Sequence, residues 1–188
     1  MPVILPSEYD IHYFDGKLGS PHPEGYWEYA LSDWMSGEIQ RYLLSLNPAV
    51  MANKKVLELG CAKGYLVEYL RNLGIDAYGI DISQYAIDNT PIPDYVTLGD
   101  IYDLSAYSNK EFDWVYSIRL LPCLDPATIP DLITNITKIS KNQLHIIDEP
   151  SYGSTDYYNL QTKETWANYS FPHGTRIVSY QTQQILIK

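Results

Sequence analysis

The glycine-containing segment Val56–Leu70, VLELGCAKGYLVEYL, constrains the fold of this chain more than any other feature. Its apolar start predicts a short strand over Lys55–Leu59, and the apolar spacing that follows predicts a helix over 64–73. Gly60 and Gly64 lie in the turn between them, where glycine allows a sharp bend and a close approach of backbone and ligand. The free N–H groups at the helix start suit a polar group of a ligand. The segment therefore predicts a ligand-binding strand–turn–helix unit.

The rest of the chain alternates short apolar strands with helical segments. Further strands are expected at Ala77–Asp81, Tyr95–Leu98, Phe112–Ile118 and Gln143–Asp148, helices at Gln84–Asn89, Pro126–Ser140 and Thr162–Tyr169, and a terminal hairpin at Arg176–Tyr180 and Gln184–Lys188. Such alternation is typical of strands buried on both faces by helices. It predicts an α/β fold with a doubly wound, Rossmann-like seven-stranded sheet, mostly parallel, with an antiparallel C-terminal strand.

The N-terminal quarter has a different pattern. Residues 1–23 are rich in proline, glycine, tyrosine and histidine and predict an extended arm or loop, whereas the apolar spacing over Glu24–Leu46 predicts a helix. With 188 residues and no long linker, the chain is expected to form one domain, 1–188. Within it, residues 1–50 would form an arm and helix that act as a lid, and 51–188 the ligand-binding core.

Charge and composition disfavour several classes of function. Thirteen basic residues against 23 acidic residues give a formal net charge of -10, which disfavours nucleic acid and anionic membranes as general partners. No apolar stretch is long enough to cross a membrane, and the N-terminus does not read as a signal peptide. The two cysteines, Cys61 and Cys123, lack the spacing of metal ligands, so no metal site is expected. A cytoplasmic location is the natural expectation.

Acidic residues follow the first strands at the edge where parallel sheets bind ligands. Asp81 ends the second expected strand and could accept both hydroxyls of a ribose. Asp100 and Ile101 follow the third strand, where a carboxylate and an apolar side chain suit the amine and ring of adenine. Together with Glu58, these acids would make a poor phosphate pocket and favour a phosphate-free, positively charged nucleoside. A nicotinamide dinucleotide site would need glycine at Tyr65, where helix and strand pack tightly.

Over most of residues 50–188 the chain resembles the class I S-adenosylmethionine-dependent methyltransferases. The run 58–64, ELGCAKG, is similar to the family's glycine-rich first motif, with Ala62 where the middle glycine usually stands, and the run 112–118, FDWVYSI, to its fourth-strand motif. The resemblance implies methyl transfer from S-adenosylmethionine, with S-adenosylhomocysteine as product. The residues that it implies for cofactor binding are Glu58, Gly60, Cys61, Ala62, Gly64, Asp81, Ile82, Asp100, Ile101 and Ser117.

The main candidates for catalysis lie at the end of the fifth expected strand. Methyl transfer needs orientation and exclusion of water, and a base only where the acceptor carries a proton of high pKa. Glu149 and Asp148 are the best acid–base candidates by position, and His173 in a breaker-rich loop is a third. Pro122 and Cys123 stand where many small family members have a Glu-His pair, which argues against a metal-assisted mechanism.

The acceptor is the least constrained part of the prediction. Tyr13 and Tyr26 of the N-terminal segment are candidates for the substrate pocket, since aromatic rings bind apolar and cationic groups. The small, acidic chain favours a small-molecule acceptor methylated on oxygen or nitrogen. Two alternatives stay open: a weak or inactive cofactor-binding partner subunit, and a protein or nucleic-acid methyltransferase, although the Asn/Asp-Pro-Pro-Tyr/Phe motif of base methylation is missing after the fourth strand.

Overall fold

The computed structural model describes residues 5–20, 22–23, 25–31, 33–147, 166, 169, 175–179 and 185–187. The strands are β1 (Lys55–Leu59), β2 (Asp76–Asp81), β3 (Val96–Leu98), β4 (Phe112–Ile118), β5 (Ser140–Ile147), β6 (Thr175–Ser179) and β7 (Ile185–Ile187). The α-helices are α1 (Ile11–Phe14), α2 (Asp33–Leu46), α3 (Pro48–Met51), α4 (Tyr65–Asn72), α5 (Gln84–Asp88) and α6 (Ile129–Ile139). The described residues also include short turns of 3-10 helix at η1 (Pro6–Glu8), η2 (Gly16–Leu18), η3 (Leu121–Cys123) and η4 (Pro126–Thr128).

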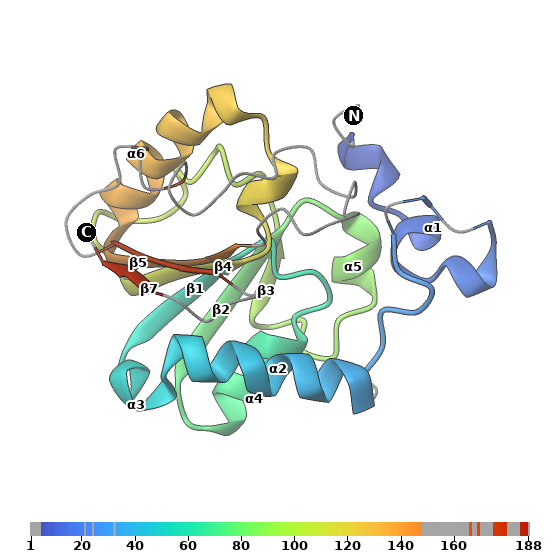
Figure 1. Ribbon diagram of the computed structural model, residues 1–188, viewed down its shortest axis with the longest axis horizontal. Coiled ribbons are helices and arrows are strands. Elements are labelled where there is room, and N and C mark those ends of the chain that lie inside the picture. The colour runs from blue at the N-terminus through green and yellow to red at the C-terminus, as the bar shows by residue number, and fades with distance from the viewer. Residues whose placement is uncertain are drawn as a thin grey trace.

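A single sheet with the strand order β3-β2-β1-β4-β5-β6-β7 forms the centre of the molecule (Figure 1). All neighbours from β3 to β6 run parallel, and β7 pairs antiparallel with the outer edge of β6. The chain returns to the middle of the sheet between β3 and β4, so the order reverses at β1 and β4. This confirms the α/β class with a mostly parallel sheet, and it directs attention to the carboxyl ends of β1 and β4, where such sheets bind ligands.

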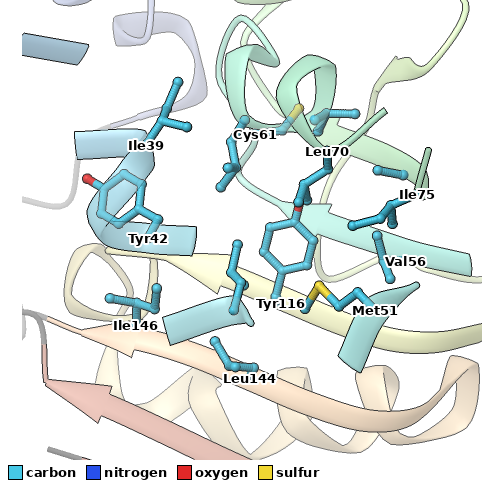
Figure 2. Close-up of a cluster of buried hydrophobic side chains, with 14 of the residues drawn as sticks. Ile39, Tyr42, Met51, Val56, Cys61, Leu70, Ile75, Tyr116, Leu144 and Ile146 are labelled. Atoms are coloured by element: carbon cyan, nitrogen blue, oxygen red, sulfur yellow. The ribbon is translucent and has the colours of Figure 1, made fainter. Parts of the chain in front are cut away.

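Two apolar layers cover the two faces of the sheet. Helices α2 and α4 pack on one face with the side chains of Val56, Tyr116 and Leu144, as Figure 2 shows for part of this cluster. Helix α6 covers the other face through five buried isoleucine and leucine side chains that meet Leu57 and Val115. Successive residues of β1 and β4 thus enter opposite cores, as the geometry of a strand requires. This double burial explains why these strands read as continuous apolar runs.

The expected helix over Glu24–Leu46 is wrong in its first part, because α2 begins at Asp33. Residues 25–31 instead run back along the preceding segment: the N–H of Tyr26 donates to the carbonyl of Tyr13 at 2.6 Å. The side chains of Trp27 and Leu31 are 66% and 58% exposed, so their helical spacing does not mark a buried face. The described part of residues 5–23, expected to be an extended arm or loop, includes the short helices η1, α1 and η2. In Figure 1 this N-terminal arm (residues 5–31) lies beside α5.

The remaining boundaries differ from expectation by a few residues. β1 and β4 are exceptions and have the predicted limits. β5 begins at Ser140 rather than at Gln143, because α6 already ends at Ile139. Of the helix expected over Thr162–Tyr169, only Trp166 and Tyr169 belong to the described residues, and the indole of Trp166 is fully buried under α6. No helix in the described part of the chain combines the length and apolar character needed to cross a membrane.

Candidate cofactor site

The turn after β1 has the backbone conformation that its glycines predict. Gly60 and Gly64 have φ angles of 69° and 79°, in the left-handed region that glycine adopts readily. Both positions are also crowded: a Cβ would lie 3.0 Å from Leu120 Cδ1 at Gly60 and 2.9 Å from Val96 Cγ1 at Gly64. Helix α4 begins at once, with Gly64 as its N-cap and no side chain capping it. The turn is therefore closely packed against its neighbours and leads directly from the carboxyl end of β1 into α4.

Asp81 joins the loops after β1 and β2. Its Oδ2 accepts a hydrogen bond from the N–H of Ala62 at 2.7 Å, and its Oδ1 accepts one from the N–H of Ser83 at 2.9 Å. The side chain is largely buried, and burial raises the pKa of the carboxyl in spite of these hydrogen bonds. The acid that the sequence predicts for ribose binding therefore also orders the glycine turn.

Glu58 is buried at the base of the same edge. It is 4% exposed, and burial, with a smaller effect from the neighbouring Asp81, raises its pKa to about 8, although the Tyr116 hydroxyl donates to Oε2 at 3.4 Å. Cys61, also buried, packs against Gly79, where a Cβ would lie 2.6 Å from its Sγ. Burial raises the pKa of this thiol well above its usual value, so it is a packing group rather than a nucleophile.

The residues after β3 lie at the same edge but differ in exposure. Asp100 is exposed, and its Oδ1 accepts a hydrogen bond from the N–H of Tyr102 at 2.9 Å. Ile101 is buried in the layer under α6 together with Ile80, and Ile82 is half-buried. A carboxylate at the surface beside a buried apolar side chain is the arrangement that the sequence predicts for this loop.

The side chain of Ser117 points into the interior of the protein. Ser117 lies one residue before the end of β4, but its side chain is fully buried and its Oγ lies 2.9 Å from Nδ1 of His145. Burial lowers the pKa of His145 to about 4, so the imidazole is neutral near pH 7. Its Nε2 lies 3.3 Å from Oε1 of Gln143, whose amide nitrogen is 3.0 Å from the hydroxyl of Thr137. The Ser117 hydroxyl is therefore committed to a buried polar chain that joins β4, β5 and α6.

Tyr13 and Tyr26 belong to an aromatic cluster in the N-terminal arm. Their ring centroids are 5.8 Å apart in an edge-to-face arrangement, and both rings are half-buried. The cluster continues through Tyr29, which packs edge-to-face on Tyr26 and stacks on Tyr65 of α4 at 5.7 Å. The arm thus brings the two predicted pocket residues together and packs against the helix that follows the glycine turn.

Two further contacts tie the arm to the predicted cofactor loops, and the sequence analysis missed both. The Lys63 ammonium, inside the glycine turn, donates to Asp15 Oδ2 at 2.5 Å. The Ser83 hydroxyl, after β2, donates to the backbone carbonyl of Tyr9. A lysine within the glycine turn of an acidic chain was a signal that a partner existed, but the partner lies 48 residues away.

Asp148, Glu149 and His173 lie outside the described residues, so their predicted roles remain predictions. Cys123 ends η3 and its Sγ lies 3.4 Å from the carbonyl oxygen of Arg119. No group of three or more metal-ligating side chains occurs among the described residues.

The described edge suits a nucleoside that carries positive charge. Glu58 and Asp81 supply two buried carboxyl groups beside the glycine turn, and the buried Ile101 supplies an apolar side chain after β3. The one cation of the turn, Lys63, is already paired with Asp15. The fold and this chemistry are those of the α/β proteins that bind a nucleoside cofactor at the switch point of the sheet.

The comparisons with known proteins identify the family. The profile described as a methyltransferase domain matches residues 26–186. The chain therefore belongs to this family, the class I S-adenosylmethionine-dependent methyltransferases, and S-adenosylmethionine is its cofactor. No curated protein matches the chain.

The solved structures that this chain is similar to have low sequence identity to it. An S-adenosylmethionine-dependent methyltransferase from Archaeoglobus fulgidus is 19% identical with a TM-score of 0.55, and the match covers 72% of this chain and 71% of that one. The PH0226 protein from Pyrococcus horikoshii OT3 is 24% identical with a TM-score of 0.49, over 58% of this chain and 57% of that one. Magnesium protoporphyrin IX methyltransferase from Synechocystis PCC 6803, solved with bound cofactor, is 17% identical with a TM-score of 0.48, over 58% and 57%.

Proposed function

We propose that this enzyme transfers the methyl group of S-adenosylmethionine to an oxygen or nitrogen atom of a small molecule bound at the carboxyl edge of the sheet. The observation that carries the proposal is the hydrogen bond from the Ala62 N–H to the Asp81 carboxylate. It joins the loops after β1 and β2 and sets the acid beside the glycine turn. In this position the Asp81 carboxylate can accept the ribose hydroxyls while the turn accommodates the methionine end of the cofactor.

The other cofactor contacts follow from the chemistry of the edge. Asp100 would accept the adenine amine, with Ile82 and Ile101 against the ring. Glu58 would lie toward the methionine end, with the turn residues Gly60, Cys61, Ala62 and Gly64 offering backbone groups. Ser117 would contribute its backbone, since its hydroxyl is 2.9 Å from His145 in the interior. The buried carboxyls of Glu58 and Asp81 then face a ligand whose sulfonium and ammonium groups are both positive.

The acceptor would bind between this edge and the N-terminal arm. When bound, S-adenosylmethionine supplies a methyl group on an excellent leaving group, so the protein mainly orients the acceptor and excludes water. Tyr13 and Tyr26 supply aromatic surface for an apolar or cationic acceptor. Glu149, with Asp148 and His173 as further candidates, would remove a proton from an acceptor oxygen or nitrogen. The net charge of -10 supports a small molecule over a nucleic acid.

The first experiment is a calorimetric titration of the protein with S-adenosylmethionine, S-adenosylhomocysteine and NAD. Each ligand is repeated on Asp81→Ala and on the control Asp76→Ala, which removes an exposed acid at the opposite end of the same strand. We expect micromolar binding of the methyl donor that is lost in Asp81→Ala and retained in Asp76→Ala. Equal loss in both variants would refute the role of Asp81, and a preference for NAD would refute the cofactor site.

A second experiment addresses the acceptor. Methyl transfer from labelled cofactor is measured with panels of small hydroxyl and amine compounds, with RNA, and with protein substrates. Labelling of small compounds supports the proposal, whereas salt-dependent labelling of RNA or labelling of proteins would overturn it. With an acceptor in hand, Glu149→Gln should lower turnover far more than cofactor affinity, and an equal loss of both would exclude Glu149 as the base.

A further inference from the structure

The turn that approaches Asp81 contains a residue in an unfavourable conformation. Ala62 has a φ angle of 50°, between the left-handed glycines Gly60 and Gly64. The N–H of Gly64 donates to the carbonyl of Cys61 at 2.9 Å, so Ala62 occupies the second position of a four-residue turn. A positive φ at this position belongs to the mirror-image turns, which favour glycine there because a Cβ is disfavoured. The surrounding structure must therefore hold Ala62 in place.

The residue after Ala62 is held on three sides. The Lys63 ammonium donates to Asp15 Oδ2 at 2.5 Å and to the Tyr29 carbonyl at 2.9 Å, while the Lys63 carbonyl accepts a hydrogen bond from the Thr90 hydroxyl at 2.8 Å. The side chains of Lys63 and Asp15 are only 7% and 8% exposed. An ion pair with so little solvent around it is screened weakly and is costly to break from one side. The backbone of the turn is thus fixed immediately beside the strained residue.

Asp15 is in turn held by its own surroundings. Its Oδ2 also accepts a hydrogen bond from the Tyr85 hydroxyl at 2.8 Å, and its Oδ1 accepts one from the N–H of Tyr29 at 3.2 Å. Burial alone would raise the pKa of Asp15, but the hydrogen bonds from Lys63 and Tyr85 lower it below the usual value. The Phe14 ring, next to Asp15, stacks on Tyr85 of α5 at 6.2 Å. The acid is therefore a charged, fixed anchor between the arm, α5 and the glycine turn.

We propose that Asp15, acting through Lys63, holds Ala62 in its left-handed conformation and so keeps the cofactor-binding turn in the shape that presents the Ala62 N–H to Asp81. Glycine would adopt this conformation without strain, and the buried ion pair to the N-terminal arm compensates for the alanine that stands there. Asp15 and Lys63 are then positioning residues rather than cofactor ligands. The inference rests on the cofactor site proposed above.

A cycle of four proteins tests the inference through the dissociation constant for S-adenosylmethionine. They are the wild type, Asp15→Asn, Ala62→Gly and the double variant. Without the Asp15 carboxylate the turn relaxes before the cofactor binds, and the cofactor must restore the left-handed alanine, so we expect affinity to fall by up to about tenfold. Glycine at position 62 adopts a positive φ without this cost in free energy, so in the Ala62→Gly background Asp15→Asn should weaken binding by less than about threefold.

Two further variants control for general damage. Glu28→Gln breaks the exposed ion pair with Lys17 in the same arm and should leave the affinity unchanged. Tyr85→Phe removes a single hydrogen bond to Asp15 and should lower the affinity for S-adenosylmethionine by less than Asp15→Asn does. This variant tests the inference even if Asp15→Asn does not fold. Rescue by Ala62→Gly is a result that simple destabilisation of the arm would not produce.

The outcomes separate this inference from the proposed function. A wild-type protein that fails to bind S-adenosylmethionine would refute the cofactor site itself. Tight binding in the wild type together with equal losses from Asp15→Asn in the alanine and glycine backgrounds would refute only the inference, because the pair would then act through the arm and not through the turn. An unchanged affinity in both Asp15→Asn and Tyr85→Phe would also overturn it.

Discussion

Glu58 gives the sharpest prediction, because its environment favours the neutral form. Burial, aided by the charge of Asp81, raises its pKa from 4.5 to about 8, whereas the carboxyl of the unfolded chain keeps its ordinary pKa. Between these two pH values the folded protein binds one more proton than the unfolded chain. The contribution of this group to stability is therefore complete below pH 4.5 and is lost progressively as the pH rises toward 8.

The magnitude follows from the linkage between protonation and folding. Each pH unit between the two pKa values lowers the free energy of unfolding by about 1.4 kcal/mol, which amounts to about 3 kcal/mol between pH 4.5 and pH 7. Glu58→Gln removes the titration while keeping the size of the side chain. The difference in unfolding free energy between Glu58→Gln and wild type should therefore grow by about 3 kcal/mol over this range, in favour of the variant.

Denaturant unfolding of both proteins at several pH values from 4.5 to 8.5 measures this difference directly. Any constant effect of the amide cancels, because only the change with pH is compared. Glu111→Gln is a matched control: Lys55 and a backbone N–H lower the pKa of Glu111, so its variant should show a small change of opposite sign. A pH-independent difference for Glu58→Gln would refute the reasoning, since it would mean that the Glu58 carboxyl titrates normally in the folded protein.

Two other substitutions test the site's packing. Gly64→Ala should destabilise the protein by about 1–3 kcal/mol, since its φ is 79° and the new Cβ would lie 2.9 Å from Val96 Cγ1. The control is Gly37→Ala on α2, where a Cβ would lie in open space, so this substitution should be neutral or stabilising. Equal changes in the thermal unfolding of the two variants would contradict the prediction for Gly64. Ser117→Ala removes the hydroxyl 2.9 Å from His145 and should lower the unfolding free energy by about 1–2 kcal/mol, with an unchanged value arguing that the contact contributes nothing.

The strands of the sheet could be predicted from the sequence because their signal is local. Lys55–Leu59 and Phe112–Ile118 are short apolar runs bounded by polar residues or glycine, and the structure gives both the predicted limits. The segment before α2 could not be predicted in this way. Its aromatic spacing resembles a helix, but the backbone of residues 25–31 bonds to the preceding segment, and Gly25 has Tyr13 backbone within 3 Å of a hypothetical Cβ. That pairing is a long-range contact with no local signature.

In the candidate site, too, the features that depend on local sequence could be predicted and those that depend on long-range contacts could not. The glycine turn, Asp81 and Asp100 were predictable, since their places depend on strand ends and on chain spacing alone. The state of each group was not, because it depends on partners distant in sequence. The buried Glu58 carboxyl contacts the hydroxyl of Tyr116, 58 residues away, whereas the fixed position of Lys63 comes from Asp15 in the arm. Net charge alone also conceals that two acids at this edge are buried.

Stability and cofactor binding should respond to Glu58 in opposite directions. A buried carboxyl with a raised pKa weakens the folded state near neutral pH, and proteins retain such groups mainly where function requires them. A positively charged cofactor beside Glu58 would favour the carboxylate, so binding would offset the weakness that the free protein carries. Glu58→Gln should then unfold at higher denaturant and bind S-adenosylmethionine less tightly. Asp15→Asn should bind less tightly without any gain in stability. Unfolding and cofactor-binding measurements together therefore distinguish Glu58, whose charge would act on the cofactor, from Asp15, which would act by positioning the glycine turn.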